Sequence, residues 1–155
     1  PSGQGGDPLK DSNGSPAGVT LATNASSDLS IDFGFVLIPP PPTGGQGCTP
    51  GYWKQSQHFD SWPAAYSPSM LFSSVFENAF PGKTLLQVLG QGGGGLNALG
   101  RHTVAALLNG ASSGVSANLS AQQVINAFNA VFPGGDYEGQ KNIFAGFNEQ
   151  GCPLN

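Results

Sequence analysis

Two cysteines and two histidines are the side chains of this 155-residue chain with the clearest capacity for chemistry. In an exported protein, two cysteines are most simply explained by one disulfide, here between Cys48 and Cys152. Such a bond would place their Cα atoms about 5–6 Å apart. Closing a loop of about 100 residues would stabilise the fold by roughly 4–5 kcal/mol in the chain-entropy model. The alternative is a pair of unrelated buried thiols.

The histidines, His58 and His102, could pair in a zinc or catalytic site, with Asp60 as a further ligand. Zinc requires three or four clustered ligands, and the sequence has no His-x-x-His, Cys-x-x-Cys or helical Glu motif to supply them. We therefore expect no metal-binding residue and no catalytic residue. His102 follows Arg101, and we expect it to be a hydrogen-bonded structural residue.

Two further motifs of enzymes are incomplete in this chain. The glycine run at 92–95 lacks the Gly-Lys-Ser/Thr of a phosphate-binding loop and does not follow a predicted strand. Serines are frequent, but none lies in a Gly-x-Ser-x-Gly elbow. The sequence therefore predicts a protein that is not an enzyme and has no cofactor.

A cluster of aromatic residues follows Cys48 and allows a binding function. Trp53, Trp62 and Tyr66 could stack on sugar rings, as aromatic side chains do in carbohydrate sites. Aromatics in a proline-rich stretch more often cover a helical core, which is the interpretation we favour. A carbohydrate- or cell-wall-binding module remains the alternative function.

The composition limits the partners. Charged residues make up 9% of the chain, the net charge is −4, and no basic cluster indicates nucleic acid. No apolar run reaches the roughly 18 residues of a membrane span. A surface rich in Ser, Thr, Asn, Gln and Gly with few charges is typical of secreted proteins, so we expect an extracellular or cell-surface location.

The elements that must position these residues are mainly helical. Apolar residues at 96, 99, 104, 107 and 108 have helical spacing and predict a central helix over Leu96–Leu108, stopped by Asn109-Gly110. Other helices are predicted from Pro68 to Phe80, from a capping box at Thr84 through Leu89, from a capping box at Ser120 to Phe132, and from an Asp136 cap onward. About five helices thus form a disulfide-closed domain over residues 48–155.

The amino-terminal part differs. Residues 1–38 are expected to be extended, with a β-strand at 29–38 or a hairpin of that strand with Val19–Leu21. Residues 39–47, four prolines and then a glycine-rich joint, are expected to be a linker. The fold class is therefore α+β. The apolar face of the strand consists of Leu29, Ile31, Phe33, Phe35 and Leu37.

Two stretches resemble parts of bacterial surface proteins. The run at 29–36, ending Asp32-Phe33-Gly34-Phe35, resembles the last strand of Cna-B or SdrD-B type β-sandwich repeats. Residues 48–155 resemble a module at the ends of secreted bacterial multidomain proteins. The matching motifs are Cys48-Thr49-Pro50-Gly51-Tyr52-Trp53-Lys54, Gly93-Gly94-Gly95-Leu96-Asn97-Ala98-Leu99, Arg101-His102, Ala105-Ala106-Leu107-Leu108-Asn109 and Gly151-Cys152-Pro153-Leu154. The resemblance implies an extracellular setting, a helical disulfide-closed fold and no reaction. A full sandwich repeat has about seven strands, whereas this chain offers one or two.

The predicted strand leads to a hypothesis about assembly. Exposing its apolar face would forgo roughly 6–10 kcal/mol of burial, and a lone strand or hairpin is marginal in water. Pairing with another copy of the chain would satisfy both the backbone and the apolar face. Repeated head to tail, such contacts give an open filament unless the rotation closes. The alternative is that residues 1–38 complete a sandwich whose other strands lie upstream in the same polypeptide.

Overall fold

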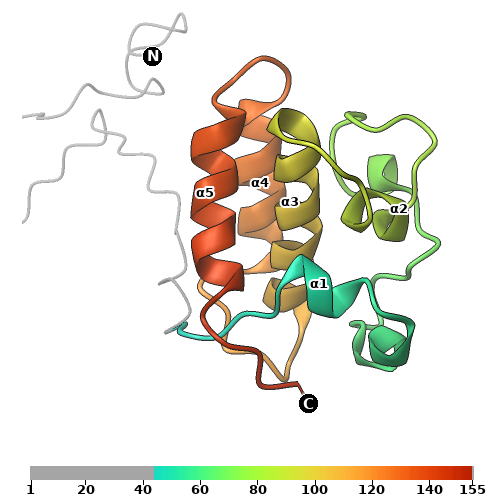
Figure 1. The fold of residues 1–155 in the computed structure, drawn as a ribbon, viewed down its shortest axis with the longest axis vertical. Coiled ribbons are helices and arrows are strands. Elements are labelled where there is room, and N and C mark those ends of the chain that lie inside the picture. Colours follow the sequence, from blue (N-terminus) through green and yellow to red (C-terminus); the bar gives the residue numbers. More distant parts are fainter. Residues whose placement is uncertain (1–43, 155) are drawn as a thin grey trace, which may run out of the picture. The chain divides into compact units, whose positions relative to one another are not determined.

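Helix α3 (Gly95–Ala111) is the element against which the other α-helices of the described chain pack. The structure, a computed structural model, describes residues 44–154. α3 contacts α1, α2, α4 and α5, and Figure 1 shows it between the α4–α5 pair and α2. Leu99, Val104, Leu107 and Leu108 are fully buried. The prediction of a central helix in a mainly helical domain is confirmed.

The end of α3 lies beyond the predicted stop. The helix continues through Asn109 and Gly110 to Ala111 because the Asn109 side chain finds hydrogen-bond partners inside the domain. Gly110 remains helical because its missing side chain lets the helix touch the backbone at Leu119–Ala121, where an added Cβ would overlap main-chain atoms. Both residues favour a turn in isolation, and tertiary contacts override that preference.

The three other helices that begin at predicted polar caps are also confirmed. α2 (Leu85–Leu89) and α4 (Ala121–Val131) begin at full capping boxes on Thr84 and Ser120. α5 (Tyr137–Asn148) begins at Asp136, whose side chain accepts a hydrogen bond from the N–H of Gly139 at 2.8 Å. These side chains satisfy backbone donors that a helix start leaves free, which is why they locate the starts so well.

The helix predicted from Pro68 to Phe80 is wrong. The structure has a single 3-10 turn there, η2 (Phe72–Ser74), flanked by turns. Serine, asparagine and phenylalanine are weak helix formers, and the N–H of Phe72 donates to the carbonyl of Lys83 at 2.9 Å. The apolar spacing still marks the core, because the buried residues of this stretch are Phe72, Phe76 and Phe80.

The segment after Cys48 contains two short helices, α1 (Pro50–Trp53) and η1 (Ser56–Ser61). Thr49 caps α1, and its hydroxyl accepts from the N–H of Tyr52 at 3.2 Å. Trp53 is fully buried and Trp62 is 8% exposed. The stretch is therefore a packed cover on the core, as predicted.

Within residues 44–154 there is no β-strand, and the β-structure is limited to two isolated antiparallel bridges, Gly47 with Gly151 and Leu71 with Thr84. The strand predicted at 29–38, with its apolar face, and the hairpin partner Val19–Leu21 lie outside the described residues. The predicted linker included residues 45–47, whereas hydrogen bonds attach these three residues to the helical domain.

Candidate functional site

The part of the domain that holds residues 44–48 is the candidate site, and we call it the junction. It consists of Gly44–Cys48 and the residues that bind them, which come from α3, α5, the 112–119 loop and the carboxyl-terminal residues. The chain enters the described part of the helical domain through these residues. Its contacts therefore decide how firmly residues 44–48 are held to the helical domain.

A disulfide closes the junction covalently. Cys48 and Cys152 are bonded, which confirms the pairing predicted from the sequence. Their Cα atoms are 4.3 Å apart, closer than the expected 5–6 Å, and the neighbouring residues Gly47 and Gly151 form an antiparallel bridge. Cys48 is fully buried and Cys152 is partly buried.

Asn109 holds the same point from inside the core. Its Oδ1 accepts hydrogen bonds from the backbone N–H of Cys48 at 2.9 Å and from the Trp53 indole N–H at 3.1 Å. Its Nδ2 donates to the Cys48 carbonyl at 2.9 Å and to Oδ1 of Asn148 at 2.8 Å. The side chain is 3% exposed, and all four of its hydrogen-bonding positions are used.

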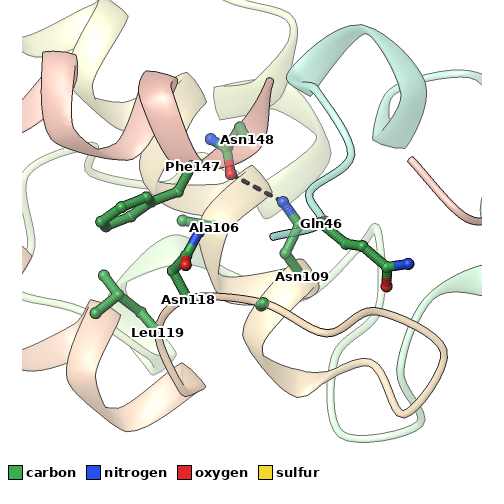
Figure 2. A pocket seen from close by; sticks show the side chains of 8 residues that line it. Gln46, Ala106, Asn109, Asn118, Leu119, Phe147 and Asn148 are labelled. Atoms are coloured by element: carbon green, nitrogen blue, oxygen red, sulfur yellow. Dashed lines mark hydrogen bonds between the residues drawn. The ribbon is translucent and has the colours of Figure 1, made fainter. Parts of the chain in front are cut away.

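Asn148 extends this network to the middle of α3. It is fully buried, and its Nδ2 donates to the backbone carbonyl of His102 at 2.9 Å. Figure 2 shows the bond between Asn109 and Asn148, which both line a small pocket. The pair therefore joins α3, α5 and the backbone of Cys48 in one continuous set of hydrogen bonds.

Residues 45 and 46 are held by the loop before α4. The backbone N–H groups of Gly45 and Gln46 both donate to the Ser116 carbonyl at 3.2 Å. The Ser116 N–H in turn donates to Oε1 of Gln46 at 2.9 Å. Ser116 is exposed, so these bonds lie at the rim of the junction and compete with water.

Two glycines make the close approach of this segment possible. A Cβ on Gly44 would overlap Asn118, and a Cβ on Gly47 would overlap the backbone of Phe147 and Asn148. Both positions therefore meet backbone atoms, which cannot move aside as a flexible side chain can. The glycine-rich composition of 44–47 thus serves contact as well as flexibility.

The pocket beside the junction is small. It has a volume of about 10 Å³, enough for about one water molecule, and it does not fit an organic ligand. Its lining residues are Gln46, Ala106, Asn109, Ala117, Asn118, Leu119, Phe147 and Asn148. Figure 2 shows these side chains gathered from α3, α5, the loop before α4 and, for Gln46, the segment before Cys48.

The predicted ligand aromatics are mostly taken up by the core. Trp53 has no exposed surface, and Trp62 donates its indole N–H to the Trp53 carbonyl at 3.1 Å. Their rings pack edge to face, with centroids 6.5 Å apart. Tyr66 is partly exposed, and burial raises the pKa of its hydroxyl. Trp53 therefore offers no ring face to a sugar, in contrast to the interpretation left open by the sequence.

The histidines lie on different elements. His58, in η1, stacks on Tyr52 with ring centroids 3.9 Å apart, whereas His102 lies in α3. In the part of the chain that the structure describes, no three His, Cys, Asp or Glu side chains are grouped to hold a metal ion. Asp60 shares η1 with His58.

His102 does not make the side-chain hydrogen bond expected of it through Nδ1. That atom is buried without a partner among the described residues. Burial lowers the pKa of the imidazole, the nearby Glu149 carboxylate opposes this, and Arg101 and Lys141 lower the pKa further. Folding therefore favours the neutral ring.

Sequence reasoning missed Asn109, Asn148 and Gly47 as residues of the junction. The sequence predicts a helix stop at Asn109, and a buried role for an asparagine inside a helix leaves no periodic signal. The position of Gly47 directly before Cys48 was the available hint, since a cystine often lies where two backbones approach closely.

No helix in the described part of the chain is both long and apolar enough to cross a membrane. No family model, no curated protein and no solved structure matches this chain.

Proposed function

We propose that this chain is a non-enzymatic extracellular structural protein that assembles with copies of itself into a filament or surface fibre. The helical domain is the body of each subunit. The segment containing the predicted strand at 29–38 is the connector, and it pairs with another copy. The chain needs no cofactor for this role.

The observation that carries the proposal is the junction. A connector between subunits must be fixed to its own body, or movement at that point would uncouple the two. Here the chain enters the body beside a disulfide and a fully hydrogen-bonded Asn109. Four prolines precede the junction, and a polyproline stretch of this length is a stiff spacer of about 12 Å.

The described residues of the helical domain offer no strand with which the predicted strand could pair. Within residues 44–154 the β-pairing consists of two isolated bridges, one beside the disulfide and one beside the Thr84 capping box. Neither provides a strand edge several residues long. A sheet partner for residues 29–38 must then come from elsewhere, and a second copy of the same segment is the proposed source.

The disulfide supports an extracellular location. Structural disulfides persist in oxidising compartments and are rare in reducing ones. The resemblance of residues 48–155 to a module of secreted bacterial proteins and of residues 29–36 to a surface-protein strand points in the same direction.

Paired variants in the full chain test this proposal. Ile31→Asp puts a charge on the apolar face of the predicted strand and should abolish assembly, as measured by light scattering and electron microscopy. Ser30→Asp puts the same charge on the opposite face and should leave assembly intact. Equal effects of the two variants, or none from either, would refute strand pairing through this face.

The alternative, a sandwich completed by strands upstream in the same polypeptide, gives a different result. The chain of 155 residues would then remain monomeric by itself. Adding the upstream strands in the same polypeptide would order residues 29–38 without any dependence on concentration. Assembly that rises with concentration favours the filament instead.

A further inference from the structure

The two ends of the helical domain meet at one covalent bond. Cys48 and Cys152 are 104 positions apart in sequence, yet their Cα atoms are 4.3 Å apart. The bond therefore encloses nearly the whole domain in a loop. The residues before Cys48 and those after Cys152 are connected through two side chains as well as through the fold.

We propose that this disulfide is a force bypass. When the chain is pulled by the residues before Cys48 and those after Cys152, tension crosses the Cys48–Cys152 bond. The residues of the loop then lie outside the path of the force and stay folded. This inference follows from the disulfide topology alone and holds whether or not the chain forms a filament.

The noncovalent contacts at the same point could not carry such tension alone. Gly47 and Gly151 form an antiparallel bridge, with a bond of 3.0 Å from the Gly47 N–H to the Gly151 carbonyl. In an antiparallel pair, the chain before Gly47 and the chain after Gly151 leave from the same end of the pair. Pulling these two segments apart breaks the hydrogen bonds one after another rather than all at once. Each bond in turn therefore carries the full applied force.

The contacts further inside the domain would also break one after another. Behind Gly47, the backbone of Cys48 is held by its two hydrogen bonds to Asn109, and then by the packing of Trp53. On the other side, α5 ends at Asn148, and Glu149 and Gln150 connect it to Gly151. Without the disulfide the domain would open from the junction inward, which is why a covalent bond at this position has a mechanical consequence.

Reduction removes the bypass by ordinary thiol exchange. One thiolate of an added dithiol attacks a cystine sulfur and forms a mixed disulfide, releasing one cysteine thiolate. The second thiol of the reagent then displaces the other cysteine, so the reagent is oxidised by two electrons and the cystine is reduced by two. Cys48 is fully buried, and attack is expected at the partly exposed Cys152.

Single-molecule stretching of the full chain, held by its two termini, tests the proposal. The oxidised chain should release no length from the helical domain up to the force at which the handles detach. After reduction by a dithiol, the fully stretched chain should be longer by about 340–370 Å, from the 104 positions between the cysteines. This difference is present even if the reduced domain is already unfolded before stretching.

Moving one handle distinguishes a force bypass through the disulfide from a domain that resists unfolding in any pulling direction. With the second handle at Ser113, in the exposed loop after α3, force must enter the domain even when the disulfide is intact. The oxidised chain should then release length at moderate force. Resistance from both handle positions would show a strong domain without a bypass. Release of the full loop length from the oxidised chain held by its termini, or no gain on reduction, would also overturn the proposal.

Discussion

Asn109 and Asn148 face each other between α3 and α5, and Nδ2 of Asn109 donates to Oδ1 of Asn148 at 2.8 Å. Each amide also binds backbone on an element far away in sequence, Cys48 for Asn109 and His102 for Asn148. Both side chains are buried, so neither can exchange its partners for water. The pair consequently attaches the backbone of Cys48, where the chain enters the domain, to α3 and α5.

Replacing Asn109 should destabilise the domain strongly. Asn109→Ala leaves the Trp53 indole N–H, both backbone groups of Cys48 and Oδ1 of Asn148 buried without this partner. We expect a loss of about 3–5 kcal/mol in the free energy of unfolding, measured by urea denaturation. Asn126→Ala, on the exposed face of α4, is the control and should change it by less than about 0.5 kcal/mol. Similar small losses in both variants would contradict the role of the network.

Breaking the disulfide should lower stability through the unfolded chain. Loss of a cross-link of this length costs roughly 4–5 kcal/mol in the chain-entropy model. Reduction of the native protein should therefore lower the midpoint of thermal unfolding substantially. The same reductant should have no effect on a Cys48→Ser, Cys152→Ser double variant. An unchanged midpoint on reduction of the native protein would be inconsistent with this account.

Gly47→Ala should disturb the junction, because the added Cβ overlaps backbone atoms of Phe147 and Asn148. We expect a loss of about 2–4 kcal/mol in stability, typical of overpacking against a backbone that cannot give way. Gly146→Ala is the matched control, since that position is helical, exposed and open around its Cβ. It should raise stability by about 0.5–1 kcal/mol. If Gly47→Ala is as stable as the native chain, residues 44–47 are not held as described.

The domain should lose stability in mild acid through His102. Burial lowers the pKa of this imidazole below its ordinary 6.5, and Arg101 and Lys141 add to this, while Glu149 acts in the opposite direction. The unfolded state then binds the proton more readily. The stabilisation is complete above about pH 6.5 and is lost as the pH falls below that value. Urea denaturation at pH 7.5 and pH 5.5 should show this loss, and His102→Gln should reduce it. A variant that loses as much stability as the native chain over this interval would exclude His102 as the cause.

Local signals in the sequence predicted much of the helical domain. Caps at Thr84, Ser120 and Asp136 act on backbone groups within three residues, so the starts of α2, α4 and α5 could be read directly. The disulfide could be predicted because the chain contains two cysteines, at the edges of the helical region.

The errors arose where distant contacts outweigh local preference. The stretch from Pro68 to Phe80 has helical apolar spacing, but its backbone pairs with Lys83 and Leu85 instead. Two large apolar side chains are exposed, Ile143 in α5 by 50% and Leu71 by 44%. The sequence predicts a helix stop at Asn109, because the four hydrogen bonds of its side chain cannot be recognised in the sequence. None of these outcomes could follow from spacing alone.

Electron microscopy of the purified chain, compared with a chain that begins at Pro39, is the most direct test of the proposed assembly. The full chain should form filaments in a concentration-dependent manner, because residues 29–38 pair between copies. The shortened chain should remain a folded, disulfide-bonded monomer, since the junction and helical core lie within residues 44–154. Filaments from the shortened chain, or a full chain that stays monomeric at high concentration, would contradict the account.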